Sequence, residues 1–531
     1  MMVYNHHVWV QTLLIFSSER LMKKFIKKFE EKIVGTLGCF DRVLFKGHLP
    51  ISSAGGMANF LRSRGVLFKD FRKYVQVPAQ ELKRYARNWA KESQRPYLYI
   101  NNKRVRKEDL ARKIADEDGI SEGLVCIIAI TEGCLSFRLK GHRNGPRLEN
   151  AKRKCLCLYF YLIHPQLGLI HVRIQTWFPF TIQVCVNGHN WLAKRMADEK
   201  IEFIQDRNSF TDISDMEKAQ NLADQFVKLP WVEILDDLAI QCNPLLVGLL
   251  SGMQYYWVCD QAEYATDVLF NDPDHLNLLY EKLLEHAIVR LGAKDILSFL
   301  DKVADGRFKG EQFNVCRRRQ MGARVRHWVK RNWIKMYNKA GVLLRIETVI
   351  NYPYDFKVYR SGIRKGEKIN GWFPLSKNVT YLYRYQQIAR TANGRYPDAL
   401  SVQDDPFPAK KDLQELVEPV THGSRRLAGF NPAREQDQKL FEEIMRAEYL
   451  VSGFRNADIR SALYGEESTR DKTRRLSSRV SRLFAKLHHR KLIAKIPRSR
   501  RWRITHKGHR VLGALLDLFH QQLPCAYAQS G

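Results

Sequence analysis

The chain has 531 residues, enough for roughly two to four domains and a large hydrophobic core. Hydrophobic residues make up 45% and charged residues 27%, as in an ordinary globular protein, but 88 Lys and Arg against 56 Asp and Glu leave a net charge of +32. Such a chain repels itself, which indicates a polyanionic partner. No apolar run in the sequence reaches the roughly 18 residues that span a bilayer. We therefore expect nucleic acid, and not a membrane, as the partner.

The amino-terminal segment and the cysteines indicate where the protein works. Residues 8–16 are apolar, but the lysines follow this run, whereas a signal peptide carries its positive charges first. We therefore expect Met22 to be the biological start. The ten cysteines form no C-x-x-C pair, so we expect free buried thiols and no structural zinc site. Free thiols are typical of a reducing cytoplasm, and the basic charge suggests a location at the nucleoid.

The first two regions of the chain predict an α+β fold with several domains. Residues 22–120 form a basic region with strands at 32–37, 41–49 and 97–100 and helices at 54–93 and 107–117. Residues 121–213 alternate apolar and polar positions and are rich in β-branched and aromatic residues, which predicts a β-rich core. Its predicted strands are 124–130, 134–139, 155–163, 169–177, 181–186 and 201–204, with a helix at 191–199.

The next regions are expected to complete this body. Residues 214–305 predict a helical insertion, and residues 306–400 a second β region that completes the core. Its strands are expected at 324–329, 333–337, 342–350 and 356–359, followed by a helix at 375–392. The body would then hold a mixed or antiparallel sheet with helical insertions. Residues 401–434 carry four prolines and few long apolar runs, which is typical of a linker.

Residues 435–523 predict a compact basic domain. Helices are expected at 438–449, from Asn456, and at 471–490; strands at 492–496 and 501–505 then flank a basic loop, and a last helix begins near His509. Between residues 470 and 503 there are fourteen Lys or Arg and one acid.

This order and charge resemble the winged helix-turn-helix family. The resemblance implies that DNA is the partner, that the third helix enters the major groove, and that the wing touches the backbone or minor groove. The residues that match are Lys472, Arg474, Arg475, Arg479 and Arg482 on the helix and Arg498, Arg500 and Arg501 on the wing.

A possible catalytic hairpin lies at residues 335–347. Lys335-x-Tyr337-x-Lys339 precedes Arg345-x-Glu347, and a turn near residue 340 would bring Tyr337 close to Glu347. A tyrosine can attack a phosphodiester, a carboxylate can hold Mg²⁺ or Mn²⁺, and basic residues can neutralise the phosphate. The stretch resembles the Y-x-K and R-x-E segments of rolling-circle replication initiators. The alternative is a basic hairpin that only binds phosphate.

Two further groups could belong to such a site. His171 and Arg173 share one face of a predicted strand and could contact phosphate. Rolling-circle nucleases present two histidines in this way, and Arg173 departs from that pattern. The alternative is a structural hydrogen-bond network. Asp41 and Asp267 interrupt apolar strands and could join Glu347 in a carboxylate cluster that holds the metal. Pairing with Arg42 or Arg345 is the alternative.

Together these features predict a metal-dependent DNA nicking or strand-transfer enzyme of a mobile genetic element, either a replication initiator or a transposase. A second possibility is a DNA-binding regulator without catalytic activity. A third is an RNA-binding component of a ribonucleoprotein, because RNA and DNA present the same phosphates. The sequence leaves the target sequence and the oligomeric state open.

Overall fold

The computed structural model describes residues 22–101, 105–143, 145–302, 311–319, 322–364, 366–401, 415–422, 425–449, 453–466 and 469–522. The segment ahead of the expected start, Cys525 and residues 402–414 of the expected linker lie outside the described residues. None of the helices in these ranges is both long enough and apolar enough to cross a membrane.

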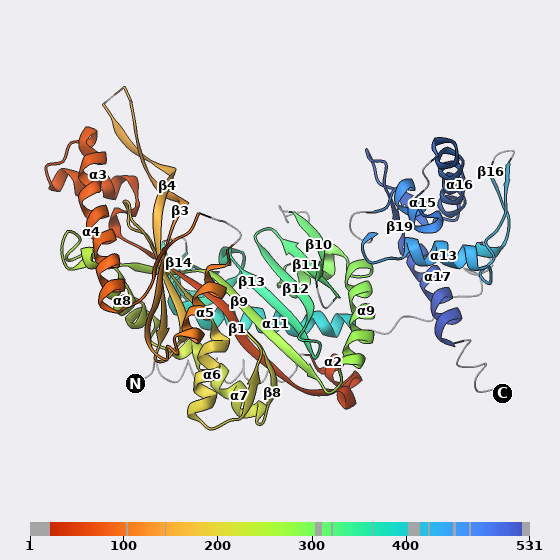
Figure 1. Ribbon diagram of the computed structural model, residues 1–531, viewed down its shortest axis with the longest axis horizontal. Helices are drawn as coiled ribbons and strands as arrows, with labels where there is room; N and C mark the ends of the chain where they lie inside the picture. Colours follow the sequence, from red (N-terminus) through yellow and green to blue (C-terminus); the bar gives the residue numbers. More distant parts are fainter. Residues whose placement is uncertain are drawn as a thin grey trace.

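The body of the protein is built on one mixed sheet (Figure 1). The strand order across its eleven strands is β10-β11-β12-β13-β9-β1-β6-β5-β4-β3-β2. The pair β2 and β3 is parallel, and the other neighbouring strands are antiparallel. The strands are β1 (Ile33–His48), β2 (Tyr97–Tyr99), β3 (Gly123–Lys140), β4 (Arg147–His164), β5 (Gly168–Gln175), β6 (Ile182–Val186), β9 (Tyr256–Phe270), β10 (Gln312–Arg319), β11 (Gly322–Val329), β12 (Asn332–Lys339) and β13 (Leu343–Ile350).

Helices and two small hairpins surround this sheet, which makes the body α+β as expected. The helices are α2 (Lys23–Lys28), α3 (Ala54–Ser63), α4 (Phe71–Glu92), α5 (Lys107–Glu117), α6 (Gly188–Asp198), α7 (Met216–Ala223), α8 (Trp231–Cys242), α9 (Pro273–Val289), α10 (Ala293–Phe299) and α11 (Leu382–Leu400). Short 3-10 turns are η1 (Glu30–Lys32), η2 (Pro50–Ser52), η3 (Phe68–Asp70), η4 (Phe226–Lys228), η5 (Pro244–Leu246), η6 (Pro353–Asp355) and η7 (Val379–Tyr381). The hairpins are β7 (Phe203–Gln205) with β8 (Phe210–Ile213), and β14 (Lys357–Arg364) with β15 (Glu367–Pro374).

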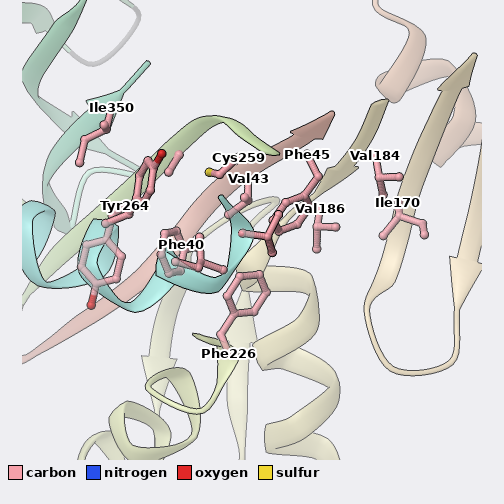
Figure 2. Packing of buried hydrophobic residues seen from close by; sticks show 14 of the residues in the cluster. Phe40, Val43, Phe45, Ile170, Val184, Val186, Phe226, Cys259, Tyr264 and Ile350 are labelled. Atoms are coloured by element: carbon pink, nitrogen blue, oxygen red, sulfur yellow. The ribbon is translucent and has the colours of Figure 1, made fainter. Parts of the chain in front are cut away.

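The main hydrophobic core lies between the sheet and the helices that cover it. Figure 2 shows Phe40 of β1 between Tyr264 of β9 and Phe226 of η4. The ring of Phe40 lies 5.2 Å from each of these two rings, and all three side chains are at most 1% exposed. Fully burying one such side chain stabilises the fold by about 1.5–3 kcal/mol. A second, smaller cluster lies between α5 and the opposite face of β3 and β4. At that end of the sheet, both faces are therefore covered, one by the main core and the other by this cluster.

Two pairs of predicted strands are each one long strand. The strands expected on either side of Gly38 are both part of β1, and those expected at 124–130 and 134–139 are both part of β3. The register of β1 against β9 shifts between Phe40 and Arg42, so that Asp41 is an extra residue in the strand. A bulge of this kind lets a strand continue through a polar residue and redirects that side chain.

The prediction that residues 214–305 form a helical insertion is wrong for one segment. Residues 214–305 contain β9, which lies between β1 and β13 in the middle of the sheet. This strand is buried along nearly its whole length, so it lacks the apolar and polar alternation by which a half-exposed strand is recognised. Residues 306–400 contain β10 to β13, which extend the same sheet.

The carboxy-terminal residues form a second unit, shown in blue in Figure 1. It has its own core, which includes Leu440, Phe454, Phe484 and Leu512. The elements follow the predicted order of three helices, a hairpin and a last helix. They are α13 (Glu435–Ile444), α15 (Asn456–Tyr464), α16 (Arg470–His489), β18 (Ile493–Lys495), β19 (Trp502–Ile504), α17 (His506–Asp517) and the π-helix η8 (Leu518–Gln522).

The described part of the expected linker belongs to this second unit. Hairpin β16 (Val420–His422) and β17 (Arg425–Leu427) lies between Leu416 and Phe430, and both of these side chains are buried in the unit's core. Arg490 after α16 donates hydrogen bonds to the carbonyl oxygens of Glu415 and Glu418. Because single apolar anchors at 416 and 430 give no periodic pattern, the sequence did not reveal them.

Candidate functional site

Polar side chains from the centre of the sheet meet on one of its faces and form what we call the polar cluster. Pairing places Lys335 opposite Glu347, and Arg345 opposite both Tyr337 and Asp267, so these side chains share a face. The cluster consists of Asp41 on β1, Glu263 and Asp267 on β9, Lys335, Tyr337 and Lys339 on β12, Arg345 and Glu347 on β13, His189 on α6, and Asn208 between β7 and β8. All the sequence-predicted site residues of the body except His171 and Arg173 are therefore brought together.

Arg345 is the centre of the polar cluster and is fully buried. It forms two hydrogen bonds of 2.6 Å with Asp267, and its Nη1 lies 3.4 Å from Asp41. A further N–H donates to the carbonyl oxygen of Asn208 at 2.7 Å, and the same nitrogen lies 3.2 Å from Nε2 of His189. Arg345 therefore has no exposed surface with which to bind a phosphate. The prediction that it contacts nucleic acid is wrong. Its role is to neutralise buried carboxylates.

Three carboxylates lie beside this arginine. Oxygens of Asp41, Glu263 and Glu347 lie within 4.8 Å of one another, and all three residues are buried. The expected third member was Asp267, which Arg345 holds instead. Glu263 lies four residues before Asp267 on the same face of β9, so strand periodicity could have pointed to it. No sequence signal indicated His189 or Asn208, which reach the cluster from α6 and from the turn between β7 and β8.

Cations already compensate these carboxylates in part. The Nζ atom of Lys335 lies 2.5 Å from Glu347 and 3.6 Å from Glu263. Arg42, whose side chain is half exposed, lies 2.5 Å from Glu263. Lys339 donates a hydrogen bond of 3.0 Å to the carbonyl oxygen of Asn208. The expected alternative, in which the acids pair with Arg42 or Arg345, is therefore found for Asp267 and Asp41, which both lie beside Arg345. Arg42 pairs instead with Glu263, which was not among the expected acids.

The pKa values of these groups are displaced in different directions. Burial, followed by repulsion from Glu347, raises the pKa of Asp41 and that of Glu263. Burial also acts to raise the pKa of Glu347, but the ammonium group of Lys335 and further neighbours hold it below its usual range. Burial and the nearby Arg345 lower the pKa of Lys339 to about 8. Glu347 is thus the carboxyl of this group that ionises most readily.

Tyr337 lies where a turn between β12 and β13 was expected to place it. Its hydroxyl donates a hydrogen bond of 3.0 Å to Oε2 of Glu347, and burial, followed by the charge of Glu347, raises the pKa of the phenol. A carboxylate in this position can accept the phenolic proton when the oxygen attacks an electrophile.

The three grouped carboxylates also have a spacing suited to a divalent cation. Two oxygens that bind one ion at about 2.1–2.4 Å can be at most about 4.8 Å apart, and hard cations such as Mg²⁺ and Mn²⁺ prefer carboxylate oxygens. Asp41, Glu263 and Glu347 meet this limit. The ammonium group of Lys335 would compete with such an ion for Glu347.

His171 and Arg173 belong to a different network. His171 packs against the rings of Tyr159 and Tyr161, and burial lowers its pKa to about 3. Arg173 donates to Glu132 at 3.0 Å and to the sulfur atoms of two cysteines. The structural alternative is therefore found for both residues, and the expected phosphate contact of Arg173 is not supported by its surroundings.

In the carboxy-terminal unit the predicted basic residues of α16 are exposed. Lys472, Arg474, Arg475, Arg479 and Arg482 are all exposed, whereas Val480, Phe484 and Leu487 of the same helix are buried. Arg498 and Arg500 of the β18–β19 turn are exposed as well. Arg501 differs, because it is partly buried and donates to the carbonyl oxygen of Gly453 at 2.9 Å.

A second basic surface was not expected from the sequence. The outer part of the β3–β4 hairpin extends past α3 in Figure 1. It carries the exposed residues Arg138, Lys140, Arg143, Arg147, Lys152, Arg153 and Lys154, and the partly exposed acid Glu149 pairs with Arg138 and Lys140. Two-stranded ribbons of this size fit the major groove of DNA. The signal in the sequence was the charge run at 152–154, directly before the predicted strand 155–163; in the structure this run is part of β4.

Because no family model matches the chain and neither curated proteins nor solved structures show a match to it, its function has to be argued from these residues.

Proposed function

We propose that this protein binds duplex DNA through α16 and the β18–β19 turn. The observation that carries the proposal is the combination of element order and exposed charge. The order α13, α15, α16, β18, β19, α17 is that of a winged helix-turn-helix domain, and Phe454 before α15 pairs with Trp502 as a third short strand. In such domains the third helix enters the major groove. Here that helix presents its basic residues to solvent.

The test compares two double variants with equal loss of charge. Arg475→Ala with Arg479→Ala removes two exposed charges of α16. Lys113→Ala with Lys218→Ala removes two exposed charges of the body that pair with Glu117 and Glu199. We expect the first pair to weaken binding of a duplex at least tenfold and the second to change it little, measured by fluorescence anisotropy. Equal effects of the two pairs would contradict the proposal, because only net charge would then matter.

We further propose that the polar cluster cuts or transfers a DNA strand, as in a nicking enzyme or transposase of a mobile genetic element. The supporting observation is that Asp41, Glu263 and Glu347 come from three strands yet lie within 4.8 Å, next to the hydroxyl of Tyr337. Three buried acids this close together are costly in a fold unless their charges are used or paired. These three would hold a Mg²⁺ or Mn²⁺ ion, which when bound polarises a phosphate.

The residues of the chain suggest how the chemistry would proceed. Glu347 accepts the phenolic proton of Tyr337, and the tyrosine oxygen attacks phosphorus. A phosphotyrosine bond forms as the bond to the departing strand oxygen breaks, and that oxygen takes up a proton. Lys339 is partly buried beside the cluster and can neutralise charge on the phosphate. A water molecule in place of Tyr337 would give hydrolysis by the same carboxylates.

The experiment uses Glu347→Gln in the full-length protein with supercoiled and single-stranded DNA. The change keeps the size of the side chain and removes its charge, so cleavage with Mg²⁺ or Mn²⁺ should be lost while DNA binding stays near wild type. Glu117→Gln, on the exposed end of α5, is the matched control and should cut normally. Lack of cleavage by the wild type with either ion would contradict the catalytic proposal but not the DNA-binding one.

A second candidate function is DNA or RNA binding without catalysis. It is favoured by Lys335 and Arg345, which already neutralise Glu347 and Asp267 and so give the polar cluster a purely structural purpose. This candidate would be favoured if addition of Mg²⁺ or Mn²⁺ left the melting temperature of the wild type unchanged.

A further inference from the structure

Three cysteines meet at the start of the β3–β4 hairpin. Cys134 lies on β3 and Cys155 and Cys157 on β4, and their sulfur atoms lie within 4.8 Å of one another. The sulfur atoms of Cys134 and Cys157 are 3.3 Å apart. Among the described residues this is the one group of cysteines brought together in this way. The C-x-C spacing with a distant third cysteine is why no metal site was expected from the sequence.

A guanidinium group points at these sulfurs. Nη2 of Arg173 lies 3.2 Å from the sulfur of Cys134 and 3.0 Å from that of Cys157, and its Nε donates to Glu132 at 3.0 Å. Its side chain is only 12% exposed. Glu132 supplies the anionic partner for Nε, but Nη2 has only the sulfurs within reach among these contacts. Neutral thiols are weak acceptors for a guanidinium donor, whereas thiolates are strong ones. The arrangement therefore suits sulfurs that carry negative charge.

We propose that Cys134, Cys155 and Cys157 bind one zinc ion as thiolates. Three thiolates this close together would repel one another unless a cation lay among them. With Zn²⁺ and the positive charge of Arg173 the charges of the three sulfurs are balanced. Sulfurs bound tetrahedrally at about 2.3 Å from zinc lie about 3.8 Å apart. The sulfurs of Cys134 and Cys157 are 3.3 Å apart, and all three sulfurs lie within 4.8 Å of one another, so small shifts would bring them to this spacing. A water molecule would complete the four ligands of the ion.

Arg173 then acts as the residue that orients the thiolates. Donors that hydrogen bond to ligand sulfurs fix their position and reduce the charge they present to the metal. Arg173 is held in turn by Glu132, which also accepts a hydrogen bond from Tyr159 and pairs with Lys107 at 3.1 Å. Since Cys134 is on the outgoing strand and the other two are on the returning strand, the ion cross-links the hairpin below its basic outer part.

The test measures metal on the full-length protein. Wild type purified from zinc-supplemented cells should retain about one Zn²⁺ per chain by elemental analysis, and X-ray absorption should show sulfur neighbours near 2.3 Å. Cys134→Ser and Cys157→Ser should each lose this zinc. Cys316→Ser on β10, a partly buried cysteine outside the group, is the matched control and should keep it.

A titration of the zinc-free wild type with Cd²⁺ makes the test independent of how the variants fold. Binding by thiolates gives an ultraviolet charge-transfer band that should saturate at about one equivalent. Absence of both zinc and this band would overturn the proposal. So would equal zinc loss in Cys316→Ser, or a Cys134–Cys157 disulfide in protein purified without oxygen.

Discussion

Arg345 on β13 and Asp267 on β9 face each other on neighbouring strands and are joined by two hydrogen bonds of 2.6 Å. Both side chains are buried, and the arginine also reaches Asp41 from the same position. A planar guanidinium that meets a carboxylate with two parallel bonds is well ordered, and here it fixes the distance between β1, β9 and β13. The carboxylates of the polar cluster are arranged around this pair.

Replacement of Arg345 by Met should strongly destabilise the fold. The change leaves the buried charge of Asp267 without a partner, which costs about 3–5 kcal/mol of unfolding free energy. Arg42→Met is the control, because the half-exposed side chain of Arg42 pairs with Glu263 and its loss should cost about 1 kcal/mol or less. Urea unfolding followed by circular dichroism measures both. Similar values for the two variants would show that Asp267 does not depend on Arg345.

Tyr337→Phe separates two mechanisms of the proposed cleavage. The change removes the hydroxyl that donates to Glu347 and leaves the ring in place. If tyrosine is the nucleophile, the variant should lose a covalent protein–DNA adduct that the wild type shows on a denaturing gel. Cleavage at the wild-type rate by Tyr337→Phe, together with no cleavage by Glu347→Gln, would instead identify water as the nucleophile.

The contacts of the polar cluster were predictable from sequence only where strand pairing is local. Tyr337 and Glu347 lie ten positions apart in one hairpin, so the turn near residue 340 was enough to bring them together. Asp41 and Glu347 are joined through β9, whose burial on both faces concealed its strand pattern. The structure groups Glu263, and not the expected Asp267, with Asp41 and Glu347, because Arg345 points at Asp267, and its direction could not be read from the sequence.

The carboxy-terminal unit was predicted well for a related reason. Its helices are amphipathic, and elements that are neighbours in the sequence are also neighbours in space. The hydrophobic periodicity of the sequence was therefore enough to predict the order of the elements. What periodicity did not show is the part played by residues 415–430, because a buried Leu416 and a buried Phe430 carry no repeat. Contacts made by a single residue at each end of a hairpin cannot be recognised from the sequence and become visible only in the structure.

The buried contacts of residues 415–430 predict which fragment of the carboxy-terminal unit is stable when isolated. Phe430 packs beneath the Nζ atom of Lys486 at 4.0 Å, and Arg490 donates to carbonyl oxygens on both sides of the β16–β17 hairpin. A fragment of residues 432–531 lacks Leu416 and Phe430 and should be less stable than a fragment of residues 411–531 by about 3 kcal/mol or more. Thermal unfolding of the two fragments measures the difference. Equal melting temperatures would mean that the hairpin contributes nothing to the unit.

Binding of duplex DNA should depend steeply on salt. The exposed basic residues of α16 and the β18–β19 turn, without Arg501, could neutralise about seven phosphates, so the log–log slope of affinity against salt should be near −6. The variant Arg475→Ala with Arg479→Ala should reduce this slope by about 2. The variant Lys113→Ala with Lys218→Ala should leave it unchanged, measured by anisotropy titrations at several salt concentrations. If the affinity of the wild type for duplex DNA did not change with salt concentration, binding would not depend on the basic residues.

The buried His327 should make the body less stable in mild acid. Its ring nitrogens lie 2.8 Å from Oδ1 of Asn314 and 2.7 Å from the hydroxyl of Tyr396, and burial lowers its pKa from 6.5 to about 3. Between these values the unfolded chain binds a proton that the folded chain does not. The unfolding free energy should therefore fall as pH decreases from about 6.5 toward about 3, by about 1.4 kcal/mol per pH unit from this residue.

The variant His327→Gln isolates this contribution. Glutamine can hydrogen bond to both neighbours but does not titrate, so the difference in unfolding free energy between wild type and variant should change with pH at that slope. Other histidines with lowered pKa, such as His171 and His189, contribute equally to both proteins and cancel in the difference. Urea unfolding at pH 7, 6 and 5 provides the comparison. A difference that stays constant with pH would show that His327 is protonated to the same extent in the folded and unfolded chains.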